Sequence, residues 1–264
     1  MKITELRLKK AMLNEEFIPF YQPIVSGVNG AISGCEVLAR WLTPEIGLLQ
    51  AGGFIEKIEH FGLTEDLTIL LANDVRNDIT ELKFVTGKNN AFILTLNINL
   101  SMLMTIMIRE YFLEFSRVLK KVGITVVFEL TERQDIHKFP KVTDIMRTLT
   151  EQGMMFAVDD FGSGYACEDL AVAAQASFIK IDASYTADPK STVSARFIDQ
   201  TLELAHKLKA RVIAEGVENE VQETWLKGLG IDFLQGYRYG RPMPAGIFFY
   251  NLAKRGASAI PAAL

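Results

Sequence analysis

Short apolar runs recur along this chain of 264 residues, and amphipathic helical stretches separate them. Each run is rich in β-branched or aromatic residues and ends in a polar residue. The runs are residues 17–25, 32–41, 92–99, 124–132, 154–160, 177–182, 211–216 and 232–237. Strands that alternate with helices predict crossover units and a parallel sheet.

The stretches between the runs have helical periodicity. Between residues 140 and 152, apolar side chains recur at i, i+3, i+4 and i+7. Pro140 suits the first position of this helix, and Gly153 suits its end. A second helix is expected to begin near Ser194, and a third at Thr64, where acidic residues follow.

Eight such units predict an α/β fold of the modified TIM (β/α)₈ barrel type, which needs about 250 residues. An open, doubly wound sheet is the alternative. Only the few residues around "SGVNG" separate the first two runs, so these two strands can be antiparallel. No Pro/Gly/Ser linker divides the chain, and residues 1–264 are expected to form a single domain.

The charge and the cysteines of the chain indicate which partners and which cellular compartment to expect. The net charge is −4 and no long run of lysine and arginine occurs, so neither DNA nor an anionic membrane surface is an expected partner. Residues 92–108 carry no charge but contain several polar side chains, and a buried strand running into a helix is expected there, not a membrane span. Cys35 and Cys167 are far apart and no signal peptide opens the chain, which favours the cytoplasm.

Polar residues mark the C-terminal ends of the runs. They are Glu36, Asn99, Glu129, Asp159 with Asp160, Lys180, Glu215 and Gln235. In a parallel barrel these strand ends face one rim, where the active sites of such barrels form. The carboxylates would repel one another there and would lose hydration, so a bound cation is expected.

The donor set indicates which cation. Carboxylates and one asparagine, without cysteine or histidine, favour Mg²⁺ or Mn²⁺ over Zn²⁺. Of the adjacent Asp159 and Asp160, one can bridge two ions while the other turns to the second, and Gly162 and Gly164 let the backbone bend around them. Two ions beside Lys180 suit phosphodiester hydrolysis. Each residue alone fits a helix cap or an ion pair, but their joint occurrence favours a shared site.

Ordered motifs resemble the signatures of EAL domains. They are "EVLAR" at 36–40, "NLS" at 99–101, "ELTE" at 129–132, "DDFGSG" at 159–164, "KID" at 180–182, "AEGVE" at 214–218 and "QGY" at 235–237. "YQPIV" at 21–25 and Pro242 agree, and the resemblance runs from about residue 5 to 250. EAL domains are modified TIM barrels that hydrolyse the bacterial messenger cyclic di-GMP to linear pGpG with Mg²⁺ or Mn²⁺, and Ca²⁺ inhibits them.

The resemblance implies a role for each matching residue. One metal is expected on Glu36, Asn99, Glu129 and Asp159, and the other on Asp159, Asp160 and Glu215. Lys180 is expected beside the catalytic water, and substrate contacts on Gln22, Arg40 and Gln235. Glu132 is expected to anchor the loop after "DDFG", and a homodimer is expected, although residues 165–176 depart from the usual family sequence.

Two alternatives belong to other function classes. An EAL-like barrel can bind cyclic di-GMP without turnover and act as a receptor or as a regulator of a partner protein. The presence of every expected metal position, with Lys180, argues against this. A barrel enzyme can instead abstract a proton beside carboxylate-bound Mg²⁺, but the paired aspartates and Asn99 fit that chemistry less well.

Overall fold

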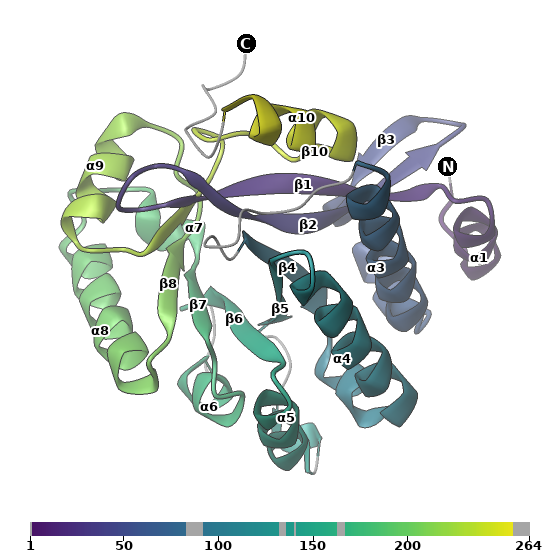
Figure 1. Cartoon of the computed structure of the whole chain (residues 1–264), viewed down its shortest axis with the longest axis horizontal. Helices are drawn as coiled ribbons and strands as arrows, with labels where there is room; N and C mark the ends of the chain where they lie inside the picture. Colours follow the sequence, from purple (N-terminus) through teal and green to yellow (C-terminus); the bar gives the residue numbers. More distant parts are fainter. Residues whose placement is uncertain (1, 83–91, 132–135, 140, 163–166, 256–264) are drawn as a thin grey trace.

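The computed structural model describes residues 2–82, 92–131, 136–139, 141–162 and 167–255 (Figure 1). Eight strands close into a barrel. They are β1 (Phe17–Ser26), β2 (Ile32–Thr43), β4 (Phe92–Ile98), β5 (Ile124–Thr131), β6 (Met155–Phe161), β7 (Phe178–Ile181), β8 (Arg211–Ala214) and β9 (Phe233–Gln235). All eight predicted runs are therefore strands.

The strands pair in chain order, and β1 closes the ring between β2 and β9. Strands β2 to β9 of the barrel are parallel, whereas β1 is antiparallel to both of its neighbours. The antiparallel first pair and the barrel are confirmed, and the open sheet is excluded. Two short strands, β3 (Gly47–Gln50) and β10 (Met243–Pro244), extend the sheet beside β2 and β1.

Helices surround the barrel (Figure 1). They are α1 (Glu5–Leu13), α2 (Ile55–His60), α3 (Thr64–Glu81), α4 (Ile106–Lys120), α5 (Val142–Glu151), α6 (Cys167–Ala173), α7 (Ala183–Thr186), α8 (Thr192–Leu208), α9 (Glu220–Gly228) and α10 (Ala245–Arg255). Short 3₁₀ turns are η1 (Ala51–Gly53), η2 (Leu100–Met104) and η3 (Ile136–Lys138). Within the described residues, no helix has both the length and the apolar character needed to cross a bilayer.

The predicted helix boundaries agree with these elements. Helix α3 begins at Thr64, and α8 begins at Thr192 because the Ser191 hydroxyl caps it. Helix α5 ends before Gly153, whose φ of +93° is left-handed and suits glycine. Pro140, the predicted first residue of α5, lies outside the described residues. The uncharged segment 92–108 forms β4, η2 and the start of α4, as expected.

Strand alternation divides the core into two parts, because successive side chains point to opposite faces. One set of side chains packs against the helices and forms the main core. The other set fills the barrel interior, and it is Ile24, Ile93, Val127, Ala157, Phe178, Ile213 and Phe233. We call this apolar layer the floor, because it lies directly beneath the polar side chains of the rim.

Candidate active site

A polar layer follows the apolar floor along the strands. On strands β5 to β9, the second residue after the floor residue is charged or carries an amide. These residues are Glu129, Asp159, Lys180, Glu215 and Gln235. Strand β1 runs in the opposite direction, and Gln22 accordingly precedes its floor residue Ile24 by two. The same alternation that buries the floor therefore turns all of these side chains into the mouth of the barrel.

Lys180 lies at the centre of the layer and is 1% exposed. Its Nζ lies 2.7 Å from Glu215 Oε1, 2.8 Å from Asp159 Oδ1, 2.9 Å from Glu129 Oε1 and 3.5 Å from Glu36 Oε2. With all four carboxylates ionised against one ammonium, the group would carry a formal charge of −3. An ammonium carries only three hydrogens, so it cannot satisfy all four partners.

Burial and crowding shift the pKa values of these groups. Burial, and then the charge of Glu36, raises the pKa of Glu129 well above its usual range. Burial likewise raises the pKa of Glu215 to about 8, although Lys180 opposes the rise. Burial alone would lower the pKa of Lys180, but the carboxylates, Asp159 and Glu129 first, raise it well above its usual value. The cluster therefore holds more negative charge than its own residues stabilise.

A bulge in β6 explains why two aspartates are adjacent. The register of β6 against β7 shifts between Val158 and Phe161, so that Asp159 and Asp160 together stand opposite the single Lys180. In a regular strand, neighbouring side chains would point to opposite faces of the sheet. The extra residue of a bulge changes that alternation and re-aims a side chain.

The backbone of Asp160 completes this change of direction. Its φ is +54°, in the left-handed region that aspartate tolerates better than most residues. Gly162 follows with a φ of +105° and turns the chain away from the barrel. As a result, carboxylate oxygens of Asp159, Asp160 and Glu215 all lie within 4.8 Å of one another, close enough to share a metal ion.

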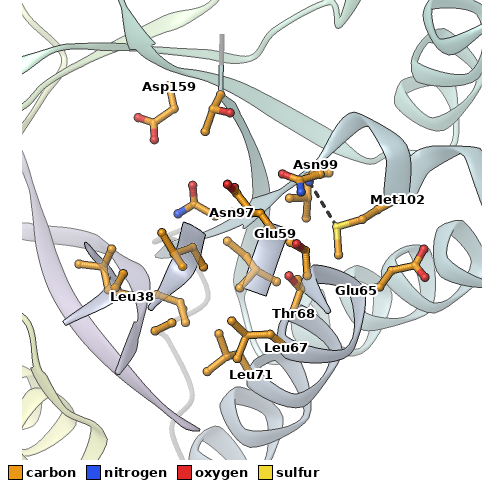
Figure 2. Close-up of a pocket in the computed structure, with 18 of the residues that line it drawn as sticks. Leu38, Glu59, Glu65, Leu67, Thr68, Leu71, Asn97, Asn99, Met102 and Asp159 are labelled. Atoms are coloured by element: carbon orange, nitrogen blue, oxygen red, sulfur yellow. Dashed lines mark hydrogen bonds between the residues drawn. The ribbon is translucent and has the colours of Figure 1, made fainter. Parts of the chain in front are cut away.

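A second asparagine, Asn97, lies two residues before the predicted Asn99 and contacts the acids. Asn97 Nδ2 donates to Glu129 Oε2 at 3.1 Å and to Glu36 Oε1 at 3.3 Å. Asn99 stands after the end of β4, where its backbone N–H meets Met102 Sδ at 3.3 Å (Figure 2). Asn97 and Asn99 both have the parity of the floor residue Ile93, and both line the same cavity as Glu36 and Asp159.

The cluster fits a divalent metal on the evidence of its own oxygens. Glu129 Oε1 and Asp159 Oδ1 are buried, and among the described residues their one polar partner is the Lys180 ammonium, at 2.9 and 2.8 Å. Buried carboxylate oxygens beside an amide are the donors that Mg²⁺ and Mn²⁺ prefer.

The two glutamines predicted to contact substrate lie next to this cluster. Gln235 Nε2 donates to Glu36 Oε2 at 2.5 Å and to Gln22 Oε1 at 3.4 Å. Its own Oε1 is buried without a described partner. The glutamine pair therefore ties β1, β2 and β9 together at the rim.

Arg40 of β2, predicted to contact the substrate phosphate, is a buried cation. It is 8% exposed, and its guanidinium lies over the Phe20 ring, 5.5 Å from the ring centroid. Burial lowers the pKa of Arg40, and the charges of Tyr237 and Glu36 oppose this. Among the described residues it forms no ion pair, and its hydrogen bond goes to the backbone carbonyl of Ala39. A buried arginine of this kind suits an anionic group of a ligand.

Two cavities meet at the acids. The first, of about 410 Å³, contains Lys180, Glu215 and Tyr237. The second, of about 850 Å³, extends between β2, α3 and η2 and is mainly apolar (Figure 2). They share Glu36, Leu38, Asp159 and Asp160. Of the predicted site residues, Glu132 lies outside the described part of the chain.

Comparison with known proteins identifies the family. The EAL domain family model matches residues 5–242. Cyclic di-GMP phosphodiesterase PdeL of Escherichia coli K12 is 33% identical over 247 residues, which are 93% of this chain and 68% of PdeL. Probable cyclic di-GMP phosphodiesterase PdeG of the same organism is 34% identical over 240 residues, but the match covers 89% of this chain and only 46% of PdeG.

Solved structures agree with this comparison. The EAL enzyme Bd1971, in its cAMP and cyclic-di-GMP bound form, superposes with a TM-score of 0.79 at 28% identity, over 94% of this chain and 68% of that one. The PaMucR phosphodiesterase in complex with c-di-GMP superposes with a TM-score of 0.76 at 27% identity, over 92% and 98% of the two chains. Together with the match over residues 5–242, these likenesses show that the chain belongs to the EAL domain family.

Proposed function

We propose that this chain is a metal-dependent phosphodiesterase that hydrolyses cyclic di-GMP to linear pGpG. The observation that carries the proposal is the ring of carboxylates around Lys180, with Asp160 beside it, at the mouth of an EAL barrel. The names of the relatives PdeL and PdeG support the choice of substrate.

Two ions, Mg²⁺ or Mn²⁺, would occupy the acidic cluster. We assign one to Glu36, Asn99, Glu129 and Asp159, and the other to Asp159, Asp160 and Glu215. Asn97 donates amide N–H groups to Glu36 and Glu129 and would orient these two acids. Bound ions of this kind polarise a phosphodiester and activate water for attack.

The chain's own residues would then position the substrate. Arg40 would neutralise a phosphate oxygen, and Gln22 with Gln235 would hold the ligand beside Glu36. Once metal ions share the carboxylates, the Lys180 ammonium can donate toward the attacking water and the developing charge. The two cavities that meet at Asp159 suit a ligand whose two guanosine halves flank the reacting phosphate.

An experiment with Ca²⁺ separates an enzyme from a receptor. Ca²⁺ forms longer bonds in looser geometry, so it should support cyclic di-GMP binding while inhibiting hydrolysis. We expect calorimetric binding of cyclic di-GMP in Ca²⁺ and conversion to pGpG when Mn²⁺ replaces it. Binding in both ions with no pGpG in either would make the chain a receptor, and the phosphodiesterase proposal would be wrong.

A further inference from the structure

Helix α7 lies between the two backbone turns that carry acids of the second metal site. It begins at Ala183, three residues after Lys180, and the Asp182 side chain caps it. Strand β7, which precedes it, pairs with β6 on one side and β8 on the other. The turn after β6 follows Asp160, and the turn after β8 contains Glu215. A single helical turn therefore contacts both flanking turns.

Tyr185 fixes the turn that follows Asp160. Its hydroxyl donates to the Gly162 carbonyl oxygen at 3.0 Å. Its ring stacks on Phe197 of α8, with 3.8 Å between the ring centroids. A Cβ added at Gly162 would lie 2.3 Å from Phe197 Cζ and 2.6 Å from Tyr185 Cε2, so the stacked rings and the turn are in close contact. The direction of Asp160 depends on this packed turn.

Thr186 fixes the turn that carries Glu215. Its side chain is fully buried, and its Oγ1 lies 2.5 Å from the Glu215 carbonyl oxygen and 3.1 Å from that of Ala183. Gln222 adds a second link, because its Nε2 donates to the carbonyls of Thr186 at 3.0 Å and Gly216 at 3.3 Å. The α7 helix is thus joined to the backbone of Glu215 itself.

We propose that α7 is a positioning element for the second metal site, in which the Tyr185 and Thr186 hydroxyls set the separation of Asp160 and Glu215. Both hydroxyls bond to backbone carbonyls, so neither residue is catalytic. The inference rests on the proposed function only through its metal site. Removal of a group that holds a metal ligand in place, without touching the metal, typically lowers metal affinity or activity by about 10–100-fold.

Variants that delete one hydroxyl test the proposal. Tyr185→Phe and Thr186→Val keep the shape of the side chains and lose the hydrogen bonds, whereas Thr186→Ser keeps the hydroxyl. Tyr111→Phe is the matched control, because the Tyr111 hydroxyl donates to Asn73 Oδ1 at 3.0 Å between α4 and α3, far from α7 along the ring of helices. Mn²⁺ binding without substrate, kcat, KM and the melting temperature are measured for each.

We expect Tyr185→Phe and Thr186→Val to weaken the second Mn²⁺ by about tenfold or more and to lower kcat with little change in KM. Thr186→Ser and Tyr111→Phe should bind Mn²⁺ as the parent does. If the two hydroxyl deletions lower only the melting temperature and their Mn²⁺ isotherms match the parent, the contacts merely hold loops and the proposal is wrong. If Thr186→Val does not fold, Tyr185→Phe decides.

The outcomes also separate this proposal from the proposed function. A parent that hydrolyses cyclic di-GMP, with variants that bind Mn²⁺ normally, overturns only the role of α7. A parent that binds Mn²⁺ without hydrolysing cyclic di-GMP, with weakened variants, overturns only the phosphodiesterase. A parent that binds no Mn²⁺ overturns both.

Discussion

Lys180 stabilises the metal-free protein because, in the part of the chain that the structure describes, it is the cation that contacts this ring of carboxylates. Its replacement leaves buried negative charge without a partner, and a change of that kind costs about 3–5 kcal/mol. We therefore expect Lys180→Met to lose about 3 kcal/mol of unfolding free energy in chelator at pH 8. Saturating Mn²⁺ should restore more stability to this variant than it adds to the parent.

Urea unfolding of both proteins, with and without Mn²⁺, measures this directly. In the same preparations, Lys180→Met should bind cyclic di-GMP and hydrolyse it poorly, because the lysine is assigned to the transition state. Equal unfolding free energies of variant and parent in chelator would show that the carboxylates are not ionised around Lys180.

Asn97 and Asn99 offer a matched pair of substitutions within one segment. Asn99 is the predicted metal position, so Asn99→Ala should lower activity by about a hundredfold and weaken Mn²⁺ binding. Asn97→Ala removes the amide hydrogen bonds to Glu36 and Glu129 and should change activity less. Steady-state rates at saturating Mn²⁺ check both. A larger loss in Asn97→Ala would move the metal position to Asn97.

The acids of the site could be predicted from the sequence, whereas the hydrogen bonds of Asn97 to two of them could not. An acid directly after an apolar run is visible without a structure, as at Asp159 and Glu215. The asparagine depends on where β4 ends, and its pairing with β5 decides that, with Ile98 opposite Leu130. Propensity alone does not fix a strand end to within two residues.

At the scale of elements, helix α3 carries two acids, Asp74 and Asp78, whose pKa values are raised by burial. Asp74 and Asp78 of α3 lie near β1, where Tyr21 Oη donates to Asp78 Oδ2 at 2.6 Å. Burial, and then the charges of Asp78 and Glu15, raise the pKa of Asp74 from 3.8 to about 6. The folded protein therefore holds this proton at a higher pH than the unfolded chain does.

The raised pKa of Asp74 makes the free energy of unfolding depend on pH. The stability linked to Asp74 is fully present below pH 3.8 and is lost as the pH rises through about 6. Asp74→Asn should therefore unfold with about 1 kcal/mol more free energy than the parent at pH 8, a figure that allows for partial solvent screening. The difference should fall as the pH is lowered to 4. Urea unfolding at the two pH values tests this, and a variant that is less stable at pH 8 would contradict it.

The direction of β1 could be predicted from the sequence, whereas the bulge in β6 could not. The tight turn after Val25 predicts the reversed β1, because five residues cannot form a crossover helix. The bulge in β6 was not predicted, since "VDD" reads equally well as a regular strand that ends in acids. Only the pairing of β6 with β7 shows that Asp159 and Asp160 share one opposite residue.

At the scale of the whole molecule, the barrel separates stability from chemistry. The apolar floor closes the interior, and the polar layer above it comes from the same strands. Reversal of β1 does not disturb this order, because Gln22 and Ile24 are also reversed along the strand. Substitutions of the rim acids should therefore affect catalysis more than folding.

A homodimer remains our prediction for the assembled protein. The family resemblance places its contact on the segment after Gly164, with Glu132 tying that loop to the metal rim. Since Asp159 and Asp160 directly precede the glycine-flanked turn that leads into this segment, we expect a dimer contact to shift metal ligands by a fraction of an ångström, which changes the rate. Sedimentation and activity are measured together across protein concentration. A fully active monomer, with Glu132→Ala indistinguishable from the parent, would contradict this coupling.

The formation of pGpG from cyclic di-GMP tests the central claim most directly. The parent and Asp159→Asn are incubated with cyclic di-GMP and Mn²⁺, with and without chelator, and the products are separated by chromatography. We expect the parent to convert cyclic di-GMP to pGpG only when Mn²⁺ is available, and Asp159→Asn to stay folded and leave the substrate intact. Full conversion in chelator, or by Asp159→Asn, would contradict a reaction at this carboxylate ring.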